Sequence, residues 1–193
     1  MPDSKLFRKQ NKLYRSREYL TPDEISRLLQ AAELRGRHPL RDKALFLLMY
    51  RHGLRVSEAI RLQWQVVMFQ TQQIYLSRLK GSKPSTHPLQ DDEVELLQAL
   101  RTRYPGRAYL FPAERAEHLS APAVTMLLKR CAELAELEIK VHPHMLRHSC
   151  GYYLVNKGYD LRKIQDWLGH RNIQHTVRYT ELDSRKFELF VFE

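Results

Sequence analysis

The sequence predicts a mainly helical α+β protein, in which amphipathic helices surround one small three-stranded antiparallel sheet. Apolar residues recur at helical spacing in most segments, and capping residues, Pro or Gly mark the segment ends. Residues 66–88 instead alternate apolar and polar positions, as strands with one buried face do. With 193 residues, 43% of them hydrophobic, the chain is long enough for a well-packed core.

Three helices are predicted before the sheet. A helix over 21–34 opens with Thr-Pro-Asp-Glu, a capping box with Pro at the first helical position. The segment from about 40 to 51 is apolar on most sides, so it is expected to be the core helix, and Gly53 ends it. Arg55 opens a third, short helix through about Leu62.

The alternating segment contains two well-marked strands joined by a turn. Within the strand 73–78, Ile74 and Leu76 alternate with polar neighbours and Tyr75 faces the other way. A turn over 80–84 joins this strand to the next one, 85–88.

The two helices after the sheet are expected at about 91–104 and 120–137. Ser120 is the predicted cap of the second one. The short apolar stretch 109–112 between them is expected to be buried.

The last 39 residues of this helical pattern, 142–180, predict three helices. Pro143 suits the first turn of one helix, which ends before Gly158. Asp160 is the cap of the next, and Gly169 stops it. The third helix is short and ends near Tyr179.

The same stretch gathers residues suited to phosphoryl chemistry near helix ends. His144 and Arg147 are three apart and share a helix face, His170 follows a Leu-Gly turn, and Tyr179 ends a helix capped by Asn172. An arginine fork can bind the non-bridging oxygens of a phosphodiester in a bidentate way. A tyrosine can attack phosphorus and conserve the energy of the broken bond in a covalent ester.

This pattern resembles the tyrosine recombinase (phage integrase) family, whose signature is Arg, Lys, His-x-x-Arg, His or Trp, and Tyr. The resemblance runs from about Thr21 to about Thr180 and keeps order and spacing. It implies the catalytic-domain fold of that family, with Tyr179 as nucleophile. The catalytic residues that it implies are Arg55, Lys80, His144, Arg147, His170 and Tyr179. The sequence of residues 142–180 is similar to that of the fimbrial phase-switch DNA invertases, a branch of the family that consists of the catalytic domain.

The resemblance implies a site-specific recombinase that breaks and rejoins DNA through a 3′-phosphotyrosyl intermediate and inverts a DNA segment. Integration or excision of a mobile element and a non-catalytic DNA-binding regulator are the alternatives. His144 is the expected general base and Lys80 the general acid, and no cofactor, metal or nucleotide is required. The expected partners are double-stranded DNA with paired sites and three further protomers in a homotetramer, with accessory DNA-bending proteins left open.

The charge of the chain favours a nucleic-acid partner. The formal net charge is +10 and the isoelectric point is near 9.7, which favours polyanions. Lys83 is expected to contact a backbone phosphate. Lys129 and Arg130 either face DNA or form a plain solvated helix face.

The expected domain organisation has three parts. Residues 1–20 carry six Lys or Arg against two acids and form either a DNA-binding arm or a solvated tail. Residues 21–180 form the catalytic domain. Residues 181–193 form a tail with an apolar end, which either docks on a neighbouring subunit or packs on its own domain.

The expected location is the bacterial cytoplasm, on the nucleoid. The chain has only two cysteines, Cys131 and Cys150, which suits a reducing compartment, and it has no apolar run as long as a membrane span.

Two other chemistries use similar residues. His144 and His148 are spaced as metal ligands on a helix, but the Glu of a His-Glu-x-x-His motif is missing, so no metal is expected and His148 is assigned a supporting role. A type IB topoisomerase uses similar groups, and the Leu-Gly-His turn and small size favour the recombinase. Glu58, three residues after Arg55, is expected to hold that arginine in place.

Overall fold

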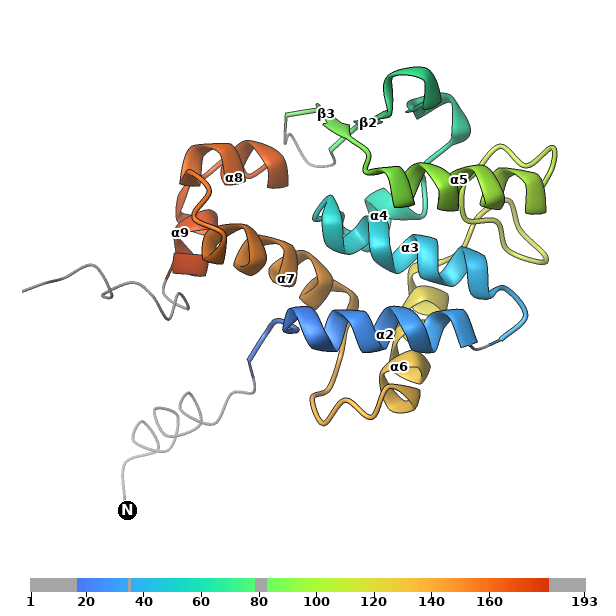
Figure 1. Ribbon diagram of the computed structural model, residues 1–193, viewed down its shortest axis with the longest axis horizontal. Coiled ribbons are helices and arrows are strands. Elements are labelled where there is room, and N and C mark those ends of the chain that lie inside the picture. The colour runs from blue at the N-terminus through green and yellow to red at the C-terminus, as the bar shows by residue number, and fades with distance from the viewer. Residues whose placement is uncertain (1–16, 35, 79–82, 181–193) are drawn as a thin grey trace, which may run out of the picture.

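The computed structural model describes residues 17–34, 36–78 and 83–180 (Figure 1). Its first helices are α2 (Pro22–Leu34), α3 (Pro39–Arg51), α4 (Val56–Ala59) and α5 (Asp91–Arg103). They are followed by α6 (Ala121–Leu134), α7 (Pro143–Asn156), α8 (Leu161–Leu168) and α9 (Gln174–Thr180). The strands are β1 (Val67–Met68), β2 (Gln73–Leu76) and β3 (Ser85–Pro88), with 3₁₀ turns at Trp64–Val66 and Phe69–Thr71. Residues 1–16 of the predicted arm, Lys80 and the tail 181–193 lie outside the described residues.

The predicted capping signals form where the sequence places them. Thr21 N donates to Glu24 Oε2 at 2.8 Å and Glu24 N donates to Thr21 Oγ1 at 3.3 Å, which confirms the capping box of α2. Ser120 Oγ accepts from Ala123 N at 3.3 Å at the start of α6. Asp160 Oδ1 accepts from the first backbone N–H groups of α8. These local bonds fix the starts of α2, α6 and α8.

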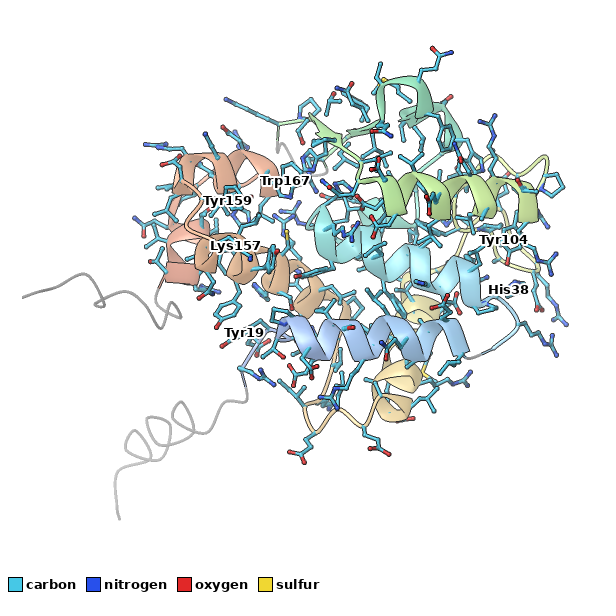
Figure 2. All side chains as sticks on the ribbon, viewed as in Figure 1. Tyr19, His38, Tyr104, Lys157, Tyr159 and Trp167 are labelled. Carbon is cyan, nitrogen blue, oxygen red and sulfur yellow. The ribbon has the colours of Figure 1, made fainter. Side chains whose placement is uncertain are left out.

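α3 is the central helix, as its apolar residues predict. Phe46 and Met49 are fully buried, and the helix packs against α2, α5 and α7 (Figure 1). His38, just before α3, and Tyr104, just after α5, are hydrogen-bonded at 2.7 Å and tie these two helices together at the end far from α8 (Figure 2).

The sheet has the order β1-β2-β3 and is antiparallel throughout, which confirms the predicted sheet. Ile74 pairs with His87 and is buried, as is Leu76, while Tyr75 is 43% exposed on the other face. β2 ends at Leu76, earlier than the predicted Arg78, because the Arg78 side chain turns into the protein interior.

Two predicted helices are shorter than expected. α4 ends at Ala59 rather than near Leu62, because the N–H groups of Arg61 and Leu62 bond three residues back, to Glu58 O and Ala59 O, in a tighter turn. α6 ends at Leu134 rather than near Leu137, because Glu136 adopts a left-handed conformation with φ 51°. In both places a turn stops a helix that propensity alone would extend.

The buried residues form one large core and a smaller second cluster. The large core lies between α2, α3, α5, α6 and the sheet, and the smaller one comprises Cys150, Val155, Ile164, Leu168 and Tyr179. α7 contributes to both, so it connects the main body to the unit formed by α8 and α9 (Figure 1). Both cysteines are buried.

The segment before α2 is anchored to α7. Leu20 is 1% exposed and its N–H donates to Ser149 Oγ at 2.8 Å, while the ring of Tyr19 stacks on that of Tyr152 at 3.9 Å (Figure 2). Tyr19 and Leu20, at the end of the predicted arm, are therefore held against α7. None of the helices in the described ranges combines the length and the apolar character needed to cross a bilayer.

Candidate active site

A pocket of about 430 Å³ lies where the start of α4, the first turns of α7 and the α8–α9 unit meet. Five of the six predicted catalytic residues line it, and Lys80 lies outside the described part of the chain. The full lining is Arg55, His144, Arg147, His148, His170, Arg171, Asn172, His175, Arg178 and Tyr179. It includes four arginines and, among the residues placed in the structure, no carboxylate. Such a pocket is suited to a polyanion.

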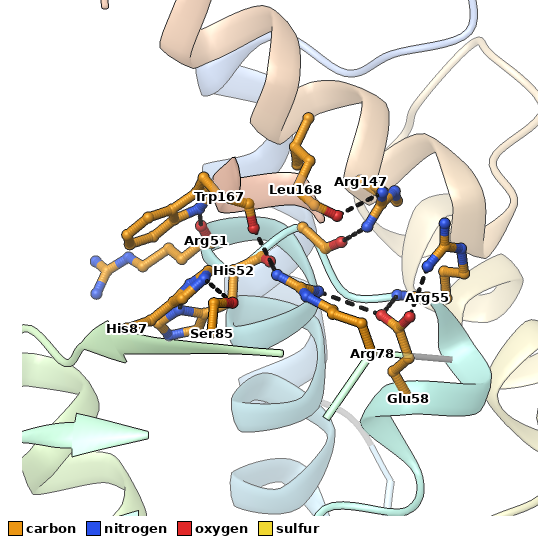
Figure 3. A network of polar contacts seen from close by, with 11 residues as sticks. Arg51, His52, Arg55, Glu58, Arg78, Ser85, His87, Arg147, Trp167 and Leu168 are labelled. Atoms are coloured by element: carbon orange, nitrogen blue, oxygen red, sulfur yellow. Dashed lines mark hydrogen bonds and ion pairs between the residues drawn. The ribbon is translucent and has the colours of Figure 1, made fainter. Parts of the chain in front are cut away.

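Arg147 lies at the base of this pocket and is 1% exposed. Its Nη1 donates to Gly53 O, and its Nη2 donates to Leu168 O at 2.7 Å (Figure 3). Burial, together with the charges of Arg55 and Arg78, lowers the pKa of Arg147 to about 10. The guanidinium is therefore charged at pH 7 and rigidly placed.

Arg55 is the residue that precedes α4, and its side chain is 33% exposed. Its Nη1 donates to Glu58 Oε1 at 2.7 Å and its backbone N–H to Glu58 Oε2 at 3.0 Å (Figure 3). Burial on its own would raise the pKa of Glu58, but the hydrogen bonds from Arg55 and the charge of Arg78 outweigh it and lower that pKa. The predicted contact between Glu58 and Arg55 is confirmed.

Tyr179 is on α9 and is only 3% exposed, although it lines the pocket. Its hydroxyl is hydrogen-bonded to His148 Nδ1 at 3.1 Å. Burial raises the pKa of Tyr179 to about 12, against the opposing charge of Arg147. Burial and the neighbouring His144 lower the pKa of His148 to about 4, so this imidazole is neutral at pH 7.

His144 lies on the first turn of α7, next to His148. The two rings meet edge to face with centroids 4.5 Å apart. Burial, followed by the charge of Arg147, lowers the pKa of His144. Within the described chain the ring that is hydrogen-bonded to the tyrosine hydroxyl belongs to His148, so the role of His144 as general base stays a prediction.

His170 follows Gly169, which adopts φ 67° and ends α8 in the left-handed conformation. His170 Nδ1 is hydrogen-bonded at 2.9 Å to Thr176 Oγ1, a fully buried hydroxyl, and its ring stacks on that of Tyr179 with centroids 6.3 Å apart. Burial and the charge of Arg147 lower the pKa of His170 to about 3. A neutral imidazole with one nitrogen fixed by Thr176 presents its other nitrogen as a defined donor or acceptor.

The other predicted DNA contacts, Lys83, Lys129 and Arg130, do not line this pocket. Lys83 is exposed two residues before β3, and Lys129 on α6 is exposed and 3.9 Å from Glu133. Arg130 lines a different cavity, beside Asp42 and Glu114. In contrast, Arg171 and Arg178 line this pocket, although the sequence analysis does not single them out. No group of three His, Cys, Asp or Glu among the described residues is arranged to hold a metal ion.

The comparisons with known proteins agree with this geometry. The family model described as "Phage integrase family" matches residues 18–186. The type 1 fimbriae regulatory protein FimB of Escherichia coli (strain K12) is 41% identical over 178 residues, which is 90% of this chain and 88% of FimB. The tyrosine recombinase XerA of Pyrococcus horikoshii is 34% identical over 86% of this chain.

A solved structure has the same fold. The site-specific recombinase XerH, in a post-cleavage complex bound to its palindromic difH substrate, matches with a TM-score of 0.76 and 25% identity over 88% of this chain. This chain covers 57% of XerA and 51% of the XerH chain. The chain belongs to the phage integrase family and is a site-specific recombinase of the tyrosine class. The predicted family and fold class are confirmed.

Proposed function

We propose that this protein inverts a segment of DNA by cutting and rejoining strands through a phosphotyrosyl ester on Tyr179. The observation that carries the chemistry is a buried tyrosine hydroxyl beside a neutral histidine, in a pocket lined by four arginines. The likeness to a fimbriae regulatory protein along nearly its whole length supports the inversion role.

Binding of the scissile phosphate is assigned to Arg55 and Arg147. They approach the pocket from α4 and α7, and each is fixed by hydrogen bonds before substrate arrives. A pentacovalent phosphorane carries more negative charge than the phosphodiester, so preorganised cations favour it over the ground state. One such donor contributes about 3–4 kcal/mol of transition-state stabilisation.

Strand cleavage exchanges one ester for another. Tyr179 Oη forms a bond to phosphorus while the bond to the 5′ oxygen breaks, which leaves a 3′-phosphotyrosyl link and a 5′ hydroxyl. The phenolic proton passes to His148, whose Nδ1 is 3.1 Å away. The 5′ oxygen takes a proton from Lys80, the general acid implied by the family resemblance. Because the number of ester bonds is unchanged, no nucleotide is consumed.

His170 is assigned to the phosphate. When Thr176 donates its hydroxyl proton to Nδ1, the imidazole proton is on Nε2 and is available to a phosphate oxygen. His144 also lies on α7, and it is assigned, together with His148, to the transfer of the phenolic proton of Tyr179.

The same chemistry in reverse completes the exchange. A 5′ hydroxyl from a second duplex attacks the tyrosyl ester and releases Tyr179. Two such exchanges on two double-stranded sites require four active sites, so the proposed assembly is a homotetramer on paired DNA sites. DNA-bending accessory proteins would help to bring these sites together.

The test is covalent trapping in the native host. Tagged wild type and Tyr179→Phe are expressed, the adducts are recovered under denaturing conditions, and the attached DNA ends are sequenced. Adducts formed only by wild type, at two inverted repeats, are expected. Adducts at a single site or at direct repeats would replace inversion by integration or excision. DNA bound under native conditions without any adduct would instead indicate a regulator without catalysis.

A further inference from the structure

A second buried arginine, Arg78, lies next to Arg147 outside the pocket. Its side chain is fully buried just beyond the end of β2. Its Nη2 donates to Trp167 O at 2.6 Å and to His52 O at 3.0 Å, and its Nη1 donates to Glu58 Oε2 at 3.2 Å (Figure 3). The lining of the catalytic pocket does not include it.

Arg78 and Arg147 bind the same two backbone turns in parallel. Arg78 bonds the carbonyls of His52 and Trp167, and Arg147 bonds the carbonyls of the next residue in each turn. Figure 3 shows both side chains directed at these turns. Together they join the end of α3 to the end of α8.

The physical basis is the C-terminal end of each helix. The last carbonyls of a helix have no partner within it, and they carry the negative end of the helix dipole. α8 ends at Leu168, so Trp167 O and Leu168 O are among its last carbonyls, whereas His52 O and Gly53 O belong to the two residues that directly follow the end of α3 at Arg51. Arg51 O is occupied as well, by Trp167 Nε1 at 3.0 Å.

These two turns lead directly to catalytic side chains. The turn at His52 continues through Leu54 to Arg55, and the turn at Trp167 continues through Gly169 to His170. A Cβ on Gly169 would lie 3.0 Å from Arg78 Cγ, which shows how closely the arginine fits beneath the turn.

Glu58 connects Arg78 to Arg55 a second time. One carboxylate oxygen accepts from the Arg55 side chain, and the other accepts from Arg78. Arg78 therefore holds Glu58 in the orientation in which it fixes Arg55, and it shares the negative charge of Glu58 with that arginine.

We propose that Arg78 is a positioning residue for strand cleavage. It sets Arg55 through Glu58 and sets His170 through the carbonyl of Trp167, without touching the phosphate itself. This inference rests on the proposed function of the pocket. Because a displacement of about 1 Å in a reacting geometry costs on the order of 10²-fold in rate, loss of this link should slow cleavage strongly while DNA binding persists.

The test compares Arg78→Lys and Arg78→Gln with a matched control, Arg41→Lys. Arg41 is also buried, at 4% exposure, and also bonds a carbonyl and a carboxylate, Pro112 O and Asp42, but it is far from the pocket. Single-turnover cleavage, Kd for DNA and Tm are measured for all variants, at a temperature well below every Tm. Both Arg78 variants should lose about 10²-fold in cleavage rate with Kd changed only a few-fold. The control should lose Tm with its cleavage rate unchanged.

A second substrate tests whether Arg78 positions other groups or instead assists the departure of the 5′ oxygen. Replacing the bridging 5′ oxygen by sulfur gives a thiolate leaving group that departs without a proton. The Arg78 variants should show the same fold-loss on both substrates. Full recovery of the cleavage rate on the sulfur substrate would overturn the proposal. It would also be overturned if Arg41→Lys lost as much cleavage rate as the Arg78 variants at an equal loss of Tm. Wild type is trapped in parallel, so a failure of wild type to form any adduct would count against the proposed function instead.

Discussion

The hydroxyl oxygen of Tyr179 lies 3.1 Å from Nδ1 of His148, a residue 31 positions earlier on α7. The pKa values of this pair lie far apart, near 12 for the phenol and near 4 for the imidazole. The proton therefore stays on the tyrosine until bonding to phosphorus begins and the phenol oxygen becomes more acidic. The pair is arranged for proton transfer during attack, not for a preformed phenolate.

Replacing His148 by Gln should therefore slow cleavage by about 10²–10⁴-fold, the usual contribution of a general base. Wild-type activity needs neutral His148, so this group should reduce cleavage only as pH falls through about 4. The measurement is the single-turnover rate of covalent adduct formation between pH 5 and 8. His144→Gln, at the neighbouring ring, is measured in parallel to show which of the two histidines takes the proton. If His144→Gln loses activity and His148→Gln does not, the base is His144.

Gly151 on α7 lies directly under the nucleophile. A Cβ at this position would lie 2.5 to 2.7 Å from three ring atoms of Tyr179. Gly151→Ala should favour helix α7 by about 1 kcal/mol of intrinsic propensity. It should nevertheless displace the tyrosine and reduce cleavage by orders of magnitude, with Kd for DNA retained. Circular dichroism, DNA binding and adduct formation together check this, and full cleavage by the alanine variant would show that the ring has room to move.

Arg55 and Arg147 should respond differently to replacement by lysine. Lysine keeps the charge but cannot reach two acceptors in a fork. Arg147→Lys leaves a buried carbonyl without its donor, which costs about 1–3 kcal/mol of unfolding free energy besides the loss of cleavage. Arg55→Lys, at a partly exposed position, should lose cleavage with a smaller change in Tm. Equal loss of DNA binding and cleavage in Arg147→Lys would show that this arginine has another role.

Several buried histidines should make the stability of the fold depend on pH. The pKa values of His87, His170 and His148 are lowered to about 2, 3 and 4, chiefly by burial. Unfolded histidines titrate near pH 6.5, so below that pH the unfolded chain binds more protons and stability falls. This contribution is fully present above pH 6.5. It is lost as pH drops towards the folded pKa values, at up to about 1.4 kcal/mol per pH unit for a fully buried group.

Denaturant unfolding at pH 8, 6.5 and 5.5 measures this slope. His87 is the most informative position, since it is 1% exposed and hydrogen-bonded to His52 and Ser85. The variant His87→Gln should have a shallower slope below pH 6.5 than wild type. An unchanged slope would show that His87 does not contribute to it.

Local signals explain why much of the fold was predictable. Thr21, Ser120 and Asp160 form the predicted caps, because a capping bond involves residues only two or three positions apart. Gly158 and Gly169 end α7 and α8 with φ values of 77° and 67°. The order and spacing of the motif placed five of its six residues around one pocket.

The parts that were not predictable depend on contacts between distant segments. The sequence predicts Arg78 only as the polar end of a strand, because its partners His52 and Trp167 lie 26 and 89 residues away along the chain. The histidine nearest the tyrosine hydroxyl was assigned a supporting role, since helical spacing does not say which ring of α7 meets α9. Arg171 and Arg178 are missed for the same reason, because only the packing of α8, α9 and the turn between them against α7 brings them to the pocket.

The measurement that tests the central claim most directly is covalent capture by the purified protein. A labelled DNA containing the recombination site is incubated with wild type or Tyr179→Phe, and the products are separated under denaturing conditions without metal or nucleotide. Wild type should give a protein–DNA adduct whose labelled peptide contains Tyr179, and Tyr179→Phe should bind the DNA equally well without forming one. An adduct of the same yield from Tyr179→Phe, or one mapped to another residue, would contradict the assignment of the nucleophile.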